Sequence, residues 1–199
     1  MERTYAKDTA HKIGETVTVM GWVNTRRDHG KLIFIDIRDR SGILQVVFTP
    51  KHGALHKEAE KLRPEWVLKV KGIIKERPVG MQNANIETGK VELEAEVLEI
   101  LNESETPPFD TEGNGYDIEE EIRLKYRYLD LRRPRLQKNM RFRGMFLERI
   151  RAFLLNKNFI EIETPLLTKS TPEGSRDFLV PSRLQPGKFY ALPQSPQQY

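Results

Sequence analysis

The first hundred residues carry short runs in which apolar and polar side chains alternate, the pattern of β-strands with one buried face. A run rich in lysine and glutamate over 51–62 is predicted to be helical. Strands are predicted over five segments: 16–24, 31–38, 42–48, 65–75 and 91–100. Five strands with a helix between the third and the fourth predict an OB-fold barrel, the architecture of many proteins that bind single-stranded nucleic acid.

The pattern changes after this barrel. Residues 102–108 are polar and include paired prolines, which favour an extended and fairly stiff connection. We therefore predict an OB-fold domain over 1–102, a linker over 103–120 and a second domain over 121–199.

The second domain begins with a helical pattern. Four apolar residues at spacings of three and four predict a helix with one apolar stripe against a core: Phe142, Phe146, Ile150 and Phe153. Beyond this helix, Ile160 and Ile162 alternate with glutamates, which predicts a half-buried strand that ends at Pro165.

Composition limits the location and the metal chemistry. The chain has 38% hydrophobic and 31% charged residues and no apolar run long enough to span a bilayer, so we expect a cytoplasmic protein that does not enter membranes. It contains no cysteine, which excludes disulfides and thiolate metal sites. His52 and His56 lie one helical turn apart, but a solvated helix face explains this spacing, and no metal site is predicted.

The outer face of the predicted barrel gives the best indication of a ligand. Ile33, Ile35 and Ile37 fall on the core side of the second strand, which leaves Phe34 on the opposite face. By the same alternation Gln45 faces outward from the third strand and is expected near Phe34. An aromatic ring beside an amide and flanked by arginines suits an unstacked base, since stacking contributes roughly 1–3 kcal/mol per base. The alternative is a phenylalanine that covers one end of the barrel. The net charge of +4 is compatible with a polyanionic partner without requiring one.

The second domain resembles a known family. The predicted helix and the strand that ends at Pro165 resemble motif 1 of the class II aminoacyl-tRNA synthetases, which forms most of their dimer interface. Residues 168–181 resemble the loop over the amino-acid pocket of the bacterial aspartyl-tRNA synthetases, and residues 194–197 resemble the strand that follows it. The resemblance covers nearly the whole chain. It implies an all-β OB-fold barrel followed by the beginning of an α+β catalytic domain, and a homodimer with Pro165 at its interface.

The barrel itself resembles the anticodon-binding domain shared by the aspartate, asparagine and lysine enzymes, on residues 21–28 and 32–36. The resemblance implies that Phe34 stacks on the central anticodon base. It assigns polar contacts with the anticodon to four residues: Arg27, Gln45, Arg77 and Glu92. Trp22 is expected in the core.

His29 lies in the turn between the first two predicted strands. Members of the family that charge both tRNA(Asp) and tRNA(Asn) commonly have a histidine here, near the third anticodon base, whereas members restricted to tRNA(Asp) commonly have a leucine. The resemblance therefore implies the dual-tRNA type. An exposed turn histidine without a role is the alternative.

Three residues match the amino-acid pocket of the family. The resemblance implies that Glu173, Ser195 and Gln197 hold the α-ammonium group of L-aspartate, and a carboxylate with neutral acceptors is what an ammonium requires. The alternatives are turn-forming roles for Glu173 after Pro172 and for Ser195 before Pro196.

The resemblance implies the activity of an aspartate–tRNA ligase for the parent enzyme. Such an enzyme forms aspartyl-adenylate from aspartate and ATP with Mg²⁺, and then transfers the aspartyl group to tRNA. The ATP and Mg²⁺ sites are expected mostly beyond Tyr199, so we assign no catalytic residue within this chain and expect the chain alone to be inactive. Two alternatives remain: a freestanding OB-fold module that binds tRNA without catalysis, and an OB-fold protein for unspecific single strands.

Overall fold

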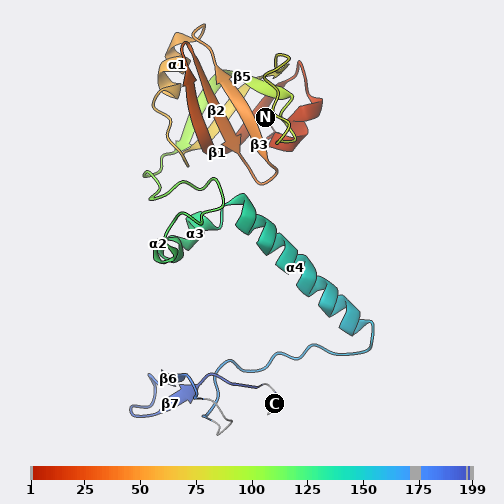
Figure 1. Ribbon diagram of the computed structural model, residues 1–199, viewed down its shortest axis with the longest axis vertical. Coiled ribbons are helices and arrows are strands. Elements are labelled where there is room, and N and C mark those ends of the chain that lie inside the picture. The colour runs from red at the N-terminus through yellow and green to blue at the C-terminus, as the bar shows by residue number, and fades with distance from the viewer. Residues whose placement is uncertain (1, 171–175, 196, 198–199) are drawn as a thin grey trace. The chain divides into compact units, whose positions relative to one another are not determined.

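The computed structural model describes residues 2–170, 176–195 and 197. The chain divides into two compact units, Met1–Leu129 and Asp130–Tyr199. Figure 1 shows a barrel of strands in the first unit, and a long helix and a small hairpin in the second. The finer division into a barrel, a linker over 103–120 and a second domain stays a prediction.

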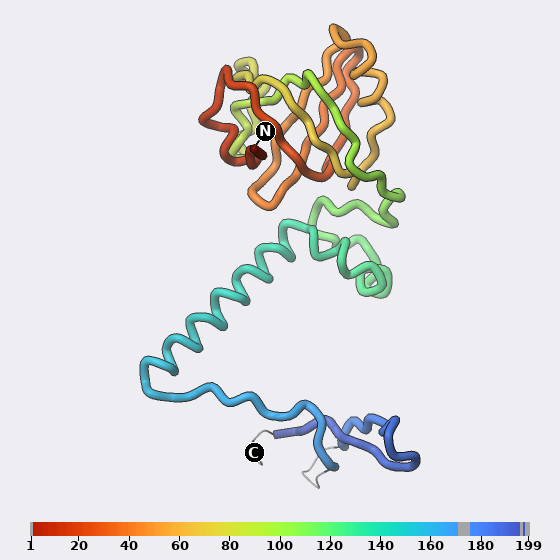
Figure 2. Tube along the Cα trace, turned by 180° about the vertical axis from the view of Figure 1, so that it is seen from behind, coloured from red at the N-terminus to blue at the C-terminus, as the bar shows by residue number. Residues whose placement is uncertain are grey.

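The core of the first unit is a closed barrel with the strand order β1-β2-β3-β5-β4. Neighbouring strands are antiparallel except β3 and β5, which run parallel and complete the closure. The strands are β1 Thr16–His29, β2 Leu32–Arg38, β3 Ile43–Phe48, β4 Val67–Glu76 and β5 Val91–Asn102. The helix α1, Gly53–Ala59, lies between β3 and β4, and a 3-10 helix η1, Ala6–His11, precedes the barrel. The tube in Figure 2 follows the same path from behind. The predicted OB-fold is confirmed.

Side-chain alternation determines which residues fill this barrel. Ile33, Ile35 and Ile37 are at most 3% exposed, as predicted for the inner face of β2. The inner residues of β3 are completely buried: Leu44, Val46 and Phe48. The prediction that Trp22 lies in the core is wrong, because Trp22 pairs with Arg38 on the outer side of β1 and is 37% exposed.

The inward positions of β1 on either side of Trp22 belong to Gly21 and Val23. A Cβ atom at Gly21 would lie 2.4 Å from the carbonyl oxygen of Arg38. Glycine therefore permits the close approach of β1 and β2 that barrel closure needs.

Two short helices lie near the boundary between the units. The helix α2, Glu120–Lys125, belongs to the first unit, and α3, Arg127–Asp130, spans the boundary. The second unit is dominated by α4, Pro134–Leu155, which confirms the predicted helix. Pro134 starts α4 because the first turn needs no backbone donor. Just before it, the Arg133 guanidinium binds the Asp130 carboxylate at 2.8 Å, with both side chains almost fully buried.

The strand predicted over 160–163 is wrong: the structure has no strand there, and Ile160 and Ile162 are 80% and 73% exposed. A strand needs a hydrogen-bonded neighbour, and no described segment pairs with this one. The stripe of α4 is likewise uncovered within the described residues, since Phe142 and Phe146 are 61% and 54% exposed.

The second unit also contains a hairpin of β6, Leu179–Pro181, and β7, Phe189–Ala191. Gly187 in the connecting turn has a φ of 78°, as the Pro186–Gly187 turn signal requires. Gln194 and Ser195 lie outside any strand, which contradicts the strand predicted at 194–197 for these two residues. Among the described helices, none combines the length and the apolar character needed to cross a membrane.

Candidate nucleic-acid interface

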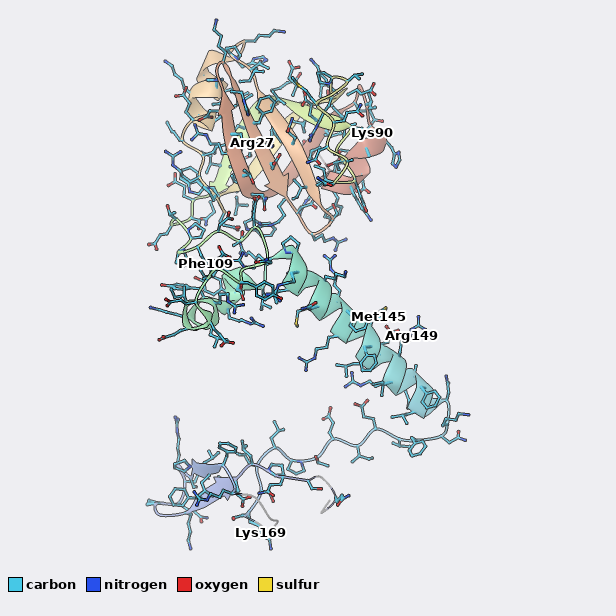
Figure 3. All side chains as sticks on the ribbon, in the orientation of Figure 1. Arg27, Lys90, Phe109, Met145, Arg149 and Lys169 are labelled. Atoms are coloured by element: carbon cyan, nitrogen blue, oxygen red, sulfur yellow. The ribbon has the colours of Figure 1, made fainter. Side chains whose placement is uncertain are left out.

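The outer face of the barrel brings together the residues that were predicted to bind an anticodon. Strand register places Arg27 of β1 opposite Phe34 of β2, and Asp36 of β2 opposite Gln45 of β3. Phe34 is partly exposed and points away from the core, so it does not plug the barrel. Figure 3 labels Arg27 on these strands. The face therefore offers an aromatic ring beside polar groups drawn from three strands.

A chain of hydrogen bonds orients the amide of Gln45. Arg27 Nη2 donates to the two carboxylate oxygens of Asp36 at 2.9 and 2.8 Å, and to Gln45 Oε1 at 3.3 Å. On the other side, Gln45 Nε2 donates to Glu92 Oε2 at 2.8 Å. Because one partner is a donor and the other an acceptor, the amide has one orientation. We call Arg27, Asp36, Gln45, Arg77 and Glu92 the outer-face cluster.

Arg77 completes this cluster from the end of β4. Its side chain is buried, with only 5% of the residue exposed, and its Nε donates to the carbonyl oxygen of Val91 at 2.9 Å. Its Nη2 is buried and has no hydrogen-bond partner in the described structure. Burial lowers the pKa of Arg77 from its ordinary value, although the carboxylates of Glu92 and Asp36 oppose the change. A buried guanidinium nitrogen without a hydrogen-bond partner is energetically unfavourable.

His29 is the last residue of β1 and lies beside Phe34. The two ring centroids are 5.7 Å apart with an interplanar angle of 76°, an edge-to-face contact. His29 is exposed, and Gly30 with a φ of 63° makes the turn that follows it. All six residues assigned to the anticodon therefore lie on or next to the same face: Arg27, His29, Phe34, Gln45, Arg77 and Glu92.

The structure describes two of the three residues predicted for the aspartate pocket, Ser195 and Gln197. Glu173 lies outside the described residues. Ser195 Oγ accepts a hydrogen bond from the backbone N–H of Gln197 at 3.3 Å, a local turn contact. Nearby, Asp177 accepts hydrogen bonds from Ser170 and from Gln194 Nε2, the latter at 2.6 Å, and so connects the pocket loop to the segment after β7.

No described group of three or more histidine, aspartate or glutamate side chains is placed to hold a metal ion. Pro165, predicted at a dimer interface, is exposed and lies outside any helix or strand.

Sequence reasoning missed two parts of the site. The first is the pairing of Asp36 with Arg27, for which the available signal was that Asp36 lies two residues after Phe34 and so faces the same side of β2. The second part is the linker, where Glu112 accepts hydrogen bonds from Asn24 Nδ2 at 2.6 Å and from Thr25 Oγ1. No local pattern in the sequence connects residues so far apart.

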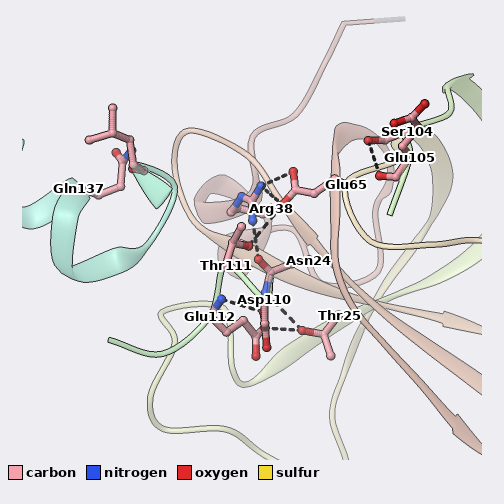
Figure 4. A network of polar contacts seen from close by, with 11 residues as sticks. Asn24, Thr25, Arg38, Glu65, Ser104, Glu105, Asp110, Thr111, Glu112 and Gln137 are labelled. Carbon is pink, nitrogen blue, oxygen red and sulfur yellow. Dashed lines mark hydrogen bonds and ion pairs between the residues drawn. The ribbon is translucent and has the colours of Figure 1, made fainter. Parts of the chain in front are cut away.

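Figure 4 shows how the linker is fastened to the barrel. Arg38 Nη2 binds both carboxylate oxygens of Glu65 at 2.9 Å, and Arg38 Nη1 donates to Asn24 Oδ1 at 2.7 Å. Thr111 Oγ1 donates to Glu65 Oε1 at 3.4 Å, and Glu112 accepts a hydrogen bond from Asn24 of β1. The linker and barrel enclose a pocket of about 400 Å³ lined in part by Arg26, Arg63, Pro107 and Phe109.

The contacts of Glu112 predict a local effect on the linker. We expect Glu112→Ala to remove the hydrogen bonds from Asn24 and Thr25 and to weaken linker docking by about 1–2 kcal/mol, since each hydrogen bond contributes about 1 kcal/mol net. Amide hydrogen exchange should become faster in 103–112 and stay unchanged in the barrel core. Glu105→Ala, at an exposed position of the same linker, is the matched control and should leave exchange unchanged. Equal exchange in both variants would contradict the role of Glu112.

Comparison with known proteins agrees with this geometry. Residues 119–199 match the family of class II tRNA synthetases (D, K and N), and residues 17–101 match the OB-fold nucleic acid binding domain. Proteins named aspartate–tRNA(Asp/Asn) ligase from Rubrobacter xylanophilus and Endomicrobium trichonymphae are 55% and 58% identical to the chain over 190 and 187 residues. The chain is therefore similar over nearly its whole length to the N-terminal part of class II tRNA synthetases. The two matches cover 96% and 94% of this chain but 32% of each relative, so the chain spans about a third of their length.

Solved synthetase structures share the fold. The asparaginyl-tRNA synthetase from Pyrococcus horikoshii, complexed with asparaginyl-adenylate, has a TM-score of 0.80 at 28% identity, over 99% of this chain and 44% of that chain. The aspartyl-tRNA synthetase from Entamoeba histolytica has a TM-score of 0.75 at 20% identity, over 87% of this chain and 41% of that one. This second likeness shows the fold alone.

Proposed function

We propose that this chain is the N-terminal part of an aspartate–tRNA ligase and that its barrel reads the anticodon. The observation that carries the proposal is the partly exposed Phe34 beside the outer-face cluster. Phe34 stacks on the central anticodon base, while Gln45 reads the edge of that base. Relatives that match nearly the whole of this chain carry the name aspartate–tRNA(Asp/Asn) ligase, which supports this choice of tRNA.

The orientation of Gln45 favours a base with adjacent acceptor and donor groups. Its Oε1 and Nε2 are held by Arg27 and Glu92, and each atom keeps one further site, a lone pair on oxygen and one N–H on nitrogen. Uracil offers a carbonyl acceptor next to the N3–H donor, which matches this pair. Arg77, whose Nε donates to the carbonyl oxygen of Val91 beside this cluster, is assigned to a further polar contact with the anticodon.

The position of His29 supports recognition of tRNA(Asn) as well as tRNA(Asp). Its ring lies against Phe34 at the edge of the face, where the next base of the triplet would follow the stacked one. The two tRNAs differ at the third anticodon position, and an exposed imidazole can donate to or accept from either base. We therefore assign tRNA(Asp) and tRNA(Asn) as substrates of the whole enzyme.

The second unit contributes to the aspartate site. Glu173, Ser195 and Gln197 are assigned to the α-ammonium group of L-aspartate, and the hydrogen bonds of Asp177 to Ser170 and Gln194 support an ordered entrance to that site. The class uses ATP and Mg²⁺, which supply activation of the carboxylate as an adenylate when bound. Positioning and charge stabilisation, rather than a covalent enzyme intermediate, then drive transfer to tRNA.

The uncovered stripe of α4 supports assembly of the whole enzyme as a homodimer. Large apolar residues of α4 are 40–63% exposed, including Phe142, Met145, Phe146, Ile150 and Phe153. Exposed apolar surface of this extent marks an interaction site in a soluble protein. Pro165 is assigned to the same interface.

Binding of short RNA hairpins tests the proposal. We expect the chain to bind a hairpin with the aspartate anticodon at least about tenfold more tightly than the same hairpin with its central uridine replaced by cytidine, which converts to about 1.4 kcal/mol. Fluorescence anisotropy at fixed salt concentration measures both constants. Equal affinity for the two hairpins would instead indicate an OB-fold protein for unspecific single strands, and no binding of either would refute an RNA-binding barrel.

A further inference from the structure

We propose that Asp36 is a positioning residue for RNA recognition, which holds Arg27 in the orientation that reads the base; this inference rests on the proposed anticodon function. Arg27 is an exposed side chain on β1. Asp36 accepts two hydrogen bonds from Arg27 Nη2, at 2.9 and 2.8 Å, from the neighbouring strand. With Nη2 fixed in this way, the same nitrogen reaches Gln45 Oε1 and orients its amide.

The position of Asp36 is unfavourable for RNA binding unless it has such a role. A carboxylate on a face that binds a polyanion repels phosphate groups, so its removal alone would strengthen binding. The two arginines whose charges act on Asp36, Arg27 and Arg77, are both in the outer-face cluster. Asp36 therefore neutralises part of the positive charge of that cluster while fixing its geometry.

Asp36 is also unfavourable for folding. Burial raises the pKa of its carboxyl above the ordinary value, even though Arg27 and Arg77 act in the opposite direction. A raised pKa means that the folded chain binds the proton more tightly than the unfolded chain. The ionised carboxylate therefore lowers stability at neutral pH, above both pKa values. A residue that costs stability and adds repulsion is consistent with a functional role.

The test is the variant Asp36→Asn, which keeps the shape of the side chain and removes its charge. We expect its affinity for the hairpin with the aspartate anticodon to fall at least about fivefold, the lower end for loss of a base-reading arginine. Its Tm should equal or exceed that of the unchanged chain. Asp28→Asn is the matched control, because Asp28 forms an ion pair with Arg26 at 2.7 Å and both residues lie on β1. The affinity of this control variant for the hairpin should equal or exceed that of the unchanged chain.

A second comparison separates action through Arg27 from any independent role. Because Asp36 works through Arg27, Arg27→Ala and the double variant Arg27→Ala/Asp36→Asn should bind the hairpin within about twofold of each other. The inference is overturned if Asp36→Asn binds as tightly as the unchanged chain or more tightly, if its Tm falls together with its affinity, or if it weakens binding equally without Arg27. If the unchanged chain does not discriminate the central base, the proposed function fails and this inference fails with it.

Discussion

Replacing Phe34 with alanine is expected to weaken binding of the hairpin with the aspartate anticodon by roughly 5- to 150-fold, since stacking on an aromatic side chain contributes about 1–3 kcal/mol per base. Phe34 lies outside the hydrophobic core, so the variant should fold with little change in Tm. The loss should also reduce discrimination at the central base, because Gln45 reads an edge only when the ring holds the base in place. Anisotropy titrations with the uridine and cytidine hairpins measure both effects.

Two variants sharpen this experiment. Phe34→Tyr keeps the ring and should keep most of the affinity, which separates stacking from a general loss of apolar surface. Phe159→Ala removes another exposed phenylalanine, 63% exposed in the second unit, and should leave hairpin binding unchanged. Binding by Phe34→Ala at full affinity would show that the outer face does not hold a stacked base.

The barrel was predictable because its signal is local. Alternation with a period of two assigns Ile35 to the core and Phe34 to the outer face from neighbouring residues alone. Trp22 was misplaced because its residue type was given more weight than its position. Val23 is completely buried, and its neighbour along the strand must therefore face outward.

The polar contacts of the site were not predictable from local patterns. The pairing of Asp36 with Arg27 depends on the register of β1 and β2, and the hydrogen bond from Asn24 to Glu112 joins residues 88 positions apart. The strand predicted over 160–163 failed for a related reason. An alternating pattern describes what a strand would bury, but pairing depends on a neighbour that the pattern does not specify.

The second large effect is expected from Glu65→Ala, which should lower the free energy of unfolding of the barrel by about 3 kcal/mol, the lower end of the cost of breaking a buried ion pair. The Glu65 and Arg38 side chains are 5% and 18% exposed, and the variant leaves the Arg38 guanidinium without its carboxylate. Glu65 also has a φ of 68°, a backbone conformation that costs energy in a residue other than glycine and that the ion pair helps to hold. Thr111 of the linker loses the same partner.

Urea unfolding followed by tryptophan fluorescence measures this change, because both tryptophans, Trp22 and Trp66, belong to the barrel strands or border them. Glu58→Ala removes an exposed glutamate from α1 and should change the free energy of unfolding by less than about 0.5 kcal/mol. The free energy of unfolding of Glu65→Gln should lie between those of Glu65→Ala and Glu58→Ala, since the glutamine amide still accepts a hydrogen bond from Arg38 but carries no charge. If Glu65→Ala were no less stable than Glu58→Ala, the Arg38–Glu65 ion pair would not contribute to the stability of the barrel.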